Sequence, residues 1–183
     1  STLINLIMRY YDDYEGEILV DGKNIKDIDL DYYRDQIGYV QQEPLMFRDT
    51  IFSNIAYGAG HVRVEQVLRA ADIAHAHEFI CRLPDAYDTV LGERGVTLSG
   101  GQKQRVAMAR AALKDAPIMI FDDSVSAVDM ATEERILSHI AKERRGKTTL
   151  IVASRVSTVA GADRILVLRD GRVEAFDTPA RLS

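Results

Sequence analysis

The chain has 183 residues, of which 46% are hydrophobic and 28% are charged, and its net charge is −5. The length suggests one domain or slightly less, and the composition is that of a folded globular protein rather than a disordered one. A net negative charge implies no basic face, which argues against non-specific binding to nucleic acid.

The hydrophobic periodicity predicts strands that alternate with helices along the chain. We expect helices at residues 2–11, 30–36, 50–57, 64–83, 99–114 and 132–144. We expect strands at residues 17–20, 37–41, 118–121 and 148–153, and a hairpin over 164–175 around Asp170-Gly171. This alternation predicts an α/β fold with a mostly parallel sheet, and the helix-rich stretch 43–114 predicts a helical insertion beside that sheet.

Two minor features have ordinary interpretations. Cys81 is the single cysteine of an apolar helical pattern and is expected to be a small buried residue. The basic run Lys142–Arg145 is expected to be solvated helix surface. The longest apolar runs, 118–121 and 165–168, are far too short to span a bilayer.

The sequence Leu98-Ser99-Gly100-Gly101-Gln102 predicts the start of a helix with unusual chemistry. Ser99 is a favourable N-cap, and Gln102 three residues later completes a capping box. A plain capped helix would explain this pair, but two glycines in the first turn weaken a helix. They leave backbone N–H groups uncovered at the positive end of the helix dipole, which suits a phosphate.

The segment Ile118–Asp122 reads as an apolar strand that ends in a carboxylate, the arrangement with which P-loop nucleotidases hold Mg²⁺. Alone this pattern is weak, because many buried strands end in Asp. Its distance from Gln102 leaves room for one helix and one short turn, and this spacing gives it weight.

Together these motifs resemble the nucleotide-binding domain of an ABC transporter of the exporter type. Gln42, within Val40–Phe47, resembles the Q-loop glutamine, and Glu93-Arg94-Gly95 resembles the exporter X-loop. The remaining matches are the signature motif Leu98–Gln102, the Walker B aspartate Asp122 and the D-loop Ser126-Ala127-Val128-Asp129, which is usually Ser-Ala-Leu-Asp.

The resemblance implies a RecA-like P-loop NTPase core of residues 1–42 and 115–183, with a helical signature-motif subdomain at 43–114. It also implies ATP and Mg²⁺ as cofactors, with Ser1, Gln42 and Asp122 as magnesium ligands and Thr2 among the nucleotide-binding residues. The implied partners are a second cassette and transmembrane domains, the latter on the same full-length chain, with no nucleic acid. The implied location is the cytoplasmic face of the plasma membrane, or of the bacterial inner membrane.

Three departures from the family pattern bear on catalysis. Ser1-Thr2-Leu3 resembles the residues that come directly after the P-loop lysine, so we expect the chain to start within that loop, without the glycine loop, its lysine and the first strands. Asp123 stands where the family has the Glu that orients the attacking water, and Ser154 stands where it has a His that contacts the γ-phosphate.

The chain thus lacks the catalytic Glu and the His of the family but keeps Gln42. This combination resembles the degenerate site of an asymmetric, heterodimeric exporter of drugs or lipids. The resemblance then implies slow hydrolysis at the chain's own site and no activity from these 183 residues alone. It implies in turn that the signature motif completes the competent site of the partner. The alternatives are an active cassette in a homodimeric exporter, with Asp123 in the role of Glu, and a non-transport ABC ATPase, which the net charge disfavours.

Overall fold

The computed structural model describes residues 2–92 and 96–182. The chain forms two compact units, of which the first ends at Val152 and the second begins at Ala153. Each unit is described by itself.

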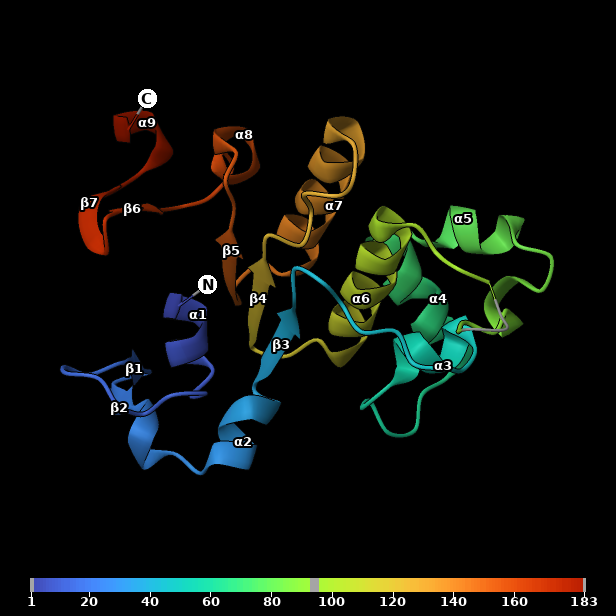
Figure 1. Ribbon diagram of the computed structural model, residues 1–183, viewed down its shortest axis with the longest axis horizontal. Coiled ribbons are helices and arrows are strands. Elements are labelled where there is room, and N and C mark those ends of the chain that lie inside the picture. Colours follow the sequence, from blue (N-terminus) through green and yellow to red (C-terminus); the bar gives the residue numbers. More distant parts are fainter. Residues whose placement is uncertain (1, 93–95, 183) are drawn as a thin grey trace. The chain divides into compact units, whose positions relative to one another are not determined.

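The first unit alternates helices and strands along the chain (Figure 1). Its helices are α1 (Thr2–Ile7), α2 (Leu30–Asp35), α3 (Ile51–Ala56), α4 (Val64–Ile73), α5 (His77–Arg82), α6 (Gly100–Lys114) and α7 (Met130–Glu143). Its strands are β1 (Leu19–Val20), β2 (Lys23–Asn24), β3 (Ile37–Val40), β4 (Ile118–Asp122) and β5 (Thr148–Val152), and short 3₁₀ turns lie at Ile25–Asp27 and Ala86–Asp88.

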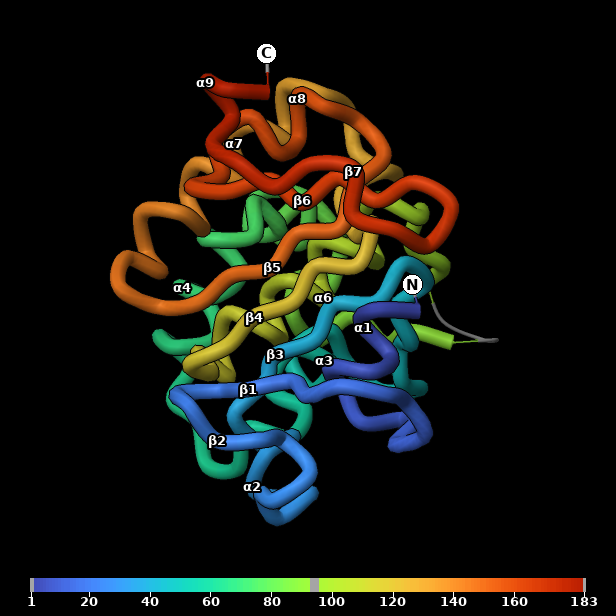
Figure 2. The backbone as a smooth tube through the Cα atoms, turned by 90° about the vertical axis from the view of Figure 1, so that its left-hand side faces the viewer, coloured from blue at the N-terminus to red at the C-terminus, as the bar shows by residue number. Residues whose placement is uncertain are grey.

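The centre of this unit is a parallel sheet of β3, β4 and β5, in which β4 lies in the middle. Ile37 pairs with Ile118, and Ile118 pairs in turn with Thr148. The carboxyl ends of the three strands therefore meet at one edge of the sheet, as Figure 2 shows from the side. This sheet confirms the predicted α/β fold with parallel strands.

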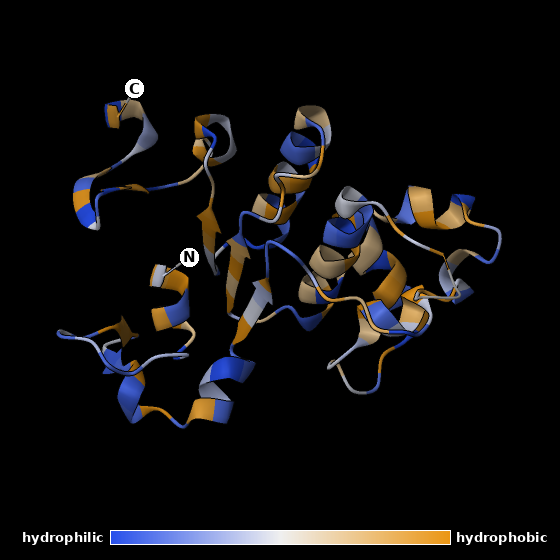
Figure 3. Cartoon of the chain, viewed as in Figure 1, coloured by the Kyte–Doolittle hydropathy of each residue, from blue (hydrophilic) through white to orange (hydrophobic). Residues whose placement is uncertain are grey.

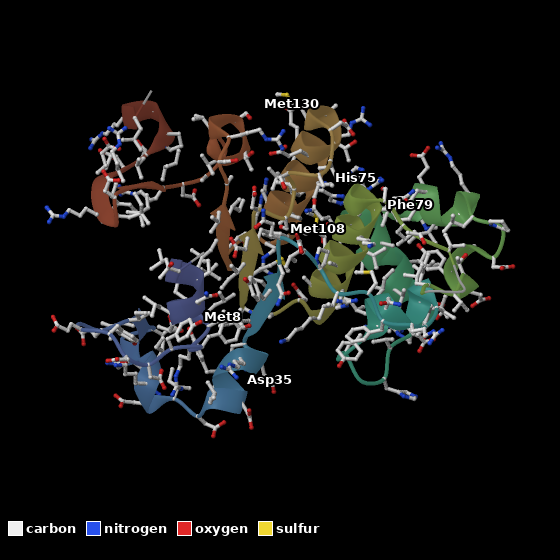
Figure 4. All side chains as sticks on the ribbon, in the orientation of Figure 1. Met8, Asp35, His75, Phe79, Met108 and Met130 are labelled. Atoms are coloured by element: carbon white, nitrogen blue, oxygen red, sulfur yellow. The ribbon has the colours of Figure 1, made fainter. Side chains whose placement is uncertain are left out.

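Strands β3 and β4 are mostly buried, whereas β5 is only partly buried, and successive side chains of each strand point to opposite faces of the sheet. Ile118 and Ile120 face a cluster with α1 and α2, whereas Met119 and Phe121 face the larger cluster built by α3, α4, α6 and α7. The strands and the inner sides of the helices are accordingly apolar in Figure 3. Figure 4 labels Met8 in the first cluster and Met108 in the second.

The single helix predicted over 64–83 is wrong, because two helices meet there at His75. His75 has φ 52°, and its N–H and that of Ala76 donate to the carbonyls of Asp72 and Ala71. This hydrogen-bond pattern closes a helix in the way that a glycine usually does. With a histidine at the left-handed position, the sequence carries no glycine to mark the break.

Arg144 corrects the interpretation of the run Lys142–Arg145 as solvated surface. Its side chain is buried and donates to the carbonyls of Ala116, Pro117 and Thr148 at 3.0–3.2 Å. The guanidinium thus ties the start of β4 to the start of β5. Cys81 also differs from expectation, since it is exposed on α5.

The second unit contains α8 (Val156–Val159), the antiparallel strands β6 (Ile165–Arg169) and β7 (Arg172–Asp177), and α9 (Pro179–Leu182). The predicted hairpin is confirmed, with Asp170 and Gly171 both at positive φ as a tight two-residue turn requires. Across the described residues of both units, no helix is long and apolar enough to cross a membrane.

Candidate nucleotide site

Asp122 closes the central strand β4 and is 8% exposed. The Tyr39 hydroxyl on β3 donates a hydrogen bond to Asp122 Oδ2 at 3.1 Å. Burial and the charge of Asp122 raise the pKa of Tyr39 to about 12. The phenol therefore remains a neutral donor at physiological pH and orients the carboxylate on the face of the sheet where α1 packs.

Gln42 and Asp123 lie together at the same edge, because each closely follows a strand of the sheet. Gln42 Nε2 donates to Asp123 Oδ2 at 3.4 Å. Asp123 has φ 48° and its N–H donates to the Val152 carbonyl at 2.9 Å. Asp tolerates this left-handed conformation better than most residues, so the backbone turns sharply after Asp122 and directs the Asp123 carboxylate towards Gln42.

The segment Ser126–Asp129 continues from this turn into α7. The Ser126 hydroxyl donates to the Asp123 carbonyl at 2.9 Å. Asp129 is the N-cap of α7 and accepts from the Thr132 N–H, and hydrogen bonding from the Thr132 side chain and then from its backbone lowers the pKa of the Asp129 carboxyl. The predicted D-loop is thus a defined connection between the end of β4 and the start of α7.

The helix α6 begins as its sequence predicts. Ser99 and Gln102 form the reciprocal capping box, with hydrogen bonds of 3.2 Å and 2.9 Å. Gly101 packs against the Ser126–Asp129 segment so closely that a Cβ there would lie 2.9 Å from the Ala127 carbonyl oxygen. A Cβ at Gly100 would meet only the Ala127 Cβ at 3.7 Å, an ordinary contact. Close packing therefore requires glycine at position 101, whereas the surface over Gly100 is open.

Gln104 is a site-associated residue that the sequence interpretation missed. It is 3% exposed, its Nε2 donates to the Gln42 carbonyl at 3.2 Å, and its Oε1 accepts from the Ala127 N–H at 3.3 Å. The sequence contains a pattern that could have identified it, because Gln104 lies on the same helical face as the apolar residues Ala107, Met108 and Ala111. A polar side chain on such a buried face needs a hydrogen-bond partner.

The other expected site residues lie in different parts of the chain. Thr2 is exposed at the start of α1, the helix whose Ile4 packs against one face of the sheet. Ser154 is exposed and belongs to the second unit. Ser1 and Glu93-Arg94-Gly95 lie outside the described residues. Within the first unit, the structure therefore brings together Gln42, Asp122 and Asp123.

Ser124 offers a test of the turn that comes after Asp123. Its side chain is fully buried, and its Oγ has no hydrogen-bond partner in the described part of the chain. Ser124→Ala is therefore expected to raise the free energy of unfolding by about 1 kcal/mol, because it removes an unsatisfied buried hydroxyl. Urea denaturation measures this. Ser126→Ala is the matched control and should give no gain, since the Ser126 hydroxyl is bonded; a loss of stability in Ser124→Ala would contradict the expectation.

Known proteins resemble this chain in sequence and in fold. The family model "ABC transporter" matches residues 1–126. The chain is 46% identical over 173 residues to the ATP-dependent lipid A-core flippase of Syntrophus aciditrophicus, covering 94% of the chain and 29% of the flippase. It is 49% identical over 182 residues to a putative multidrug export ATP-binding/permease protein of Staphylococcus aureus, covering 100% of the chain and 32% of that protein.

The solved structure of a bacterial Atm1-family ABC exporter with ATP bound is similar over 99% of the chain and 32% of the exporter, with TM-score 0.94 and 44% identity. The chain thus spans about a third of the length of these relatives. The family model covers more than half of the chain, and Gln42, Asp122 and Asp123 lie together at the carboxyl edge of the sheet. The chain therefore belongs to the ABC transporter family.

Proposed function

We propose that the chain is the ATP-binding and ATP-hydrolysing cassette of an ABC exporter and powers transmembrane transport through ATP-driven dimerisation. The observation that carries this proposal is the group Gln42, Asp122 and Asp123 at the carboxyl edge of a parallel sheet. In open α/β sheets, ligands bind outside this edge. The relatives named for lipid A-core and multidrug export support the exporter assignment.

The residues at this edge suit a magnesium nucleotide. Mg²⁺ prefers oxygen ligands, and Asp122 and Gln42 supply a carboxylate and an amide oxygen from neighbouring strand ends. We propose that these two residues, with Ser1, hold the ion and that Thr2 at the start of α1 contacts the nucleotide. Bound Mg²⁺ would neutralise phosphate charge, while Tyr39 keeps the Asp122 carboxylate in place.

We propose that the core comprises residues 1–42 and 115–183 and that residues 43–114 form a helical subdomain which meets the transmembrane part. An exposed apolar group on this stretch supports the contact: Leu45 is 70% exposed, Tyr57 59% and Phe47 36%. The two rings stack with centroids 4.0 Å apart, and Arg110 lies over both. An exposed apolar patch of this kind marks an interaction site.

We further propose that the transmembrane domains lie on the same full-length chain, because the relatives are about three times as long as these residues. The cassette would then sit at the cytoplasmic face of the plasma membrane, or of the bacterial inner membrane. In that assembly the helix start Leu98–Gln102 would present its backbone N–H groups to the nucleotide of a second cassette.

We propose that the chain forms a heterodimer with a different cassette and that its own site hydrolyses ATP slowly. A carboxylate one methylene shorter than Glu reaches less far, and about 1 Å of misplacement can cost on the order of 10²-fold in rate. Asp123 is also engaged by Gln42 rather than free to reach further. Ser154 carries no positive charge with which to contact a γ-phosphate.

Nucleotide retention in the full-length assembly tests this proposal. After turnover with ATP labelled on either the α- or the γ-phosphate, rapid filtration should recover one nucleotide per assembly that still carries its γ-phosphate. Retention of ADP alone would contradict a slow site. Absence of any Mg²⁺-dependent ATP hydrolysis by the assembly would contradict the cassette itself.

A second candidate is an active cassette of a homodimeric exporter. The position of Asp123 favours it, because this residue keeps a carboxyl group beside Gln42 at the edge of the sheet, where it would take the role of the Glu. Brisk hydrolysis by a purified homodimer, with no retained γ-label, would establish this candidate instead.

A further inference from the structure

The side chain of Gln104 joins two segments that lie far apart in the sequence. Its donor group contacts the carbonyl of Gln42, 62 positions away, and its acceptor contacts the N–H of Ala127, 23 positions away. Both partners are backbone groups of fixed polarity, so the amide has only one orientation that satisfies both. At 3% exposure, the loss of either bond leaves a buried polar group unpaired.

Gln104 also lies one turn into the helix that begins with Gly100 and Gly101. Arg105, the next residue, donates to the Gly101 carbonyl, and Gly101 itself packs against the Ala127 carbonyl. The Gln42 segment (residues 41–43), the Ser126–Asp129 segment and the first turn of α6 are therefore linked through Gln104 and Gly101. A displacement of the Gln42 backbone can therefore displace the Ser126–Asp129 segment and the first turn of α6 through the side chain of Gln104.

We propose that Gln104 is a positioning residue that couples the Gln42 segment to the Ser126–Asp129 segment and to the start of α6. Gln42 touches Asp123 through its side chain and Gln104 through its carbonyl. When nucleotide engages the side chain of Gln42, Gln104 passes the displacement of the backbone to Ala127. The orientation in which Gly100 and Gly101 meet the second cassette then depends on the nucleotide in this one. This inference rests on the proposed function.

The side-chain chemistry of Gln104 allows a specific test. Met has the same length but neither donor nor acceptor, and ionised Glu accepts from Ala127 but cannot donate to the Gln42 carbonyl. Burial raises the pKa of a carboxyl group, so Glu at this position gains a proton at mildly acidic pH and with it a donor. Gln104→Glu should therefore recover on acidification, whereas Gln104→Met should not.

The experiment measures steady-state ATP hydrolysis by the full-length assembly in the wild type, Gln104→Met, Gln104→Glu and the control Lys103→Met. We expect kcat of Gln104→Met to fall about tenfold while KM for ATP changes less than about twofold, because binding contacts remain and alignment is lost. The kcat of Gln104→Glu relative to the wild type should rise about fivefold between about pH 8 and about pH 6. Lys103→Met should match the wild type.

Each other outcome overturns the inference. A Gln104→Met variant with normal kcat, or with an altered KM alone, would show that the amide does not align the segments. If the pH profile of kcat for Gln104→Glu runs parallel to that of the wild type, the amide of Gln104 does not align the segments. This comparison alone tests the inference if Gln104→Met does not fold. Failure of the wild type to hydrolyse ATP would remove the proposed function and this inference together, whereas normal wild-type turnover with unaffected variants would remove the inference alone.

Discussion

Arg144→Met is expected to lower the free energy of unfolding by about 3 kcal/mol, because the variant removes a buried charged donor that contacts one buried and two partly buried carbonyl groups. Arg144 is 5% exposed and donates to Ala116 O, Pro117 O and Thr148 O, with a further bond from its Nε to Thr149 Oγ1. Methionine has a similar apolar stem and satisfies none of these acceptors. Urea denaturation of the two proteins measures the difference.

Arg145→Met is the matched control, because Arg145 is the exposed neighbour in the same basic run. A surface substitution of this kind is usually within about 0.5 kcal/mol of the wild type. Equal effects of the two substitutions would show that Arg144 does not tie β4 to β5. A selective effect would show that the contacts of Arg144 stabilise the packing of β4, the strand that ends in Asp122, beside β5.

Asp123→Glu is expected to accelerate loss of the γ-phosphate at the chain's own site on the order of 10²-fold, because the longer carboxylate would restore about 1 Å of reach towards the attacking water. The measurement is the single-turnover rate at which retained ATP loses its γ-label in the full-length assembly. The left-handed backbone at residue 123, with φ 48°, suits Asp better than Glu, so the gain in rate is expected together with a small loss of stability.

Asp123→Asn is the control for this substitution. It keeps the size of the side chain and can still contact Gln42, but it cannot accept a proton from water, so it should not accelerate the reaction. An unchanged rate in Asp123→Glu would indicate that reach is not the limiting feature of the site. Adding Ser154→His should then be tested, because Ser154 is the other departure from the family pattern.

The architecture of the first unit was largely predictable from hydrophobic periodicity. The strands expected at 37–41, 118–121 and 148–153 correspond to β3, β4 and β5, because β-rich apolar runs bounded by helices leave little choice in an α/β fold. The capped start of α6 was also predictable, since the capping box is local in sequence.

The features that sequence reasoning missed depend on contacts between distant residues. The apolar pattern of 64–83 runs through His75, whose left-handed conformation is stabilised in part by Arg105 donating to its carbonyl at 3.1 Å. Arg144 is one of several neighbouring basic residues, and only the packing of β4 and β5 distinguishes it. Gln104 likewise acquires its role from Gln42 and Ala127, which the fold brings to the same edge of the sheet.

In the proposed assembly, the chain contributes more to catalysis through its signature motif than through its own carboxylate. Gly100→Asp is suited to test it, because a Cβ at Gly100 meets only an ordinary contact and an acidic residue favours a helix N-terminus, yet its charge repels a phosphate. In the full-length assembly, steady-state ATP hydrolysis should fall to background in Gly100→Asp and remain within about twofold of the wild type in Asp123→Ala. Loss of hydrolysis in Asp123→Ala as complete as in Gly100→Asp would show that the chain's own carboxylate is needed for catalysis and that its site is not degenerate.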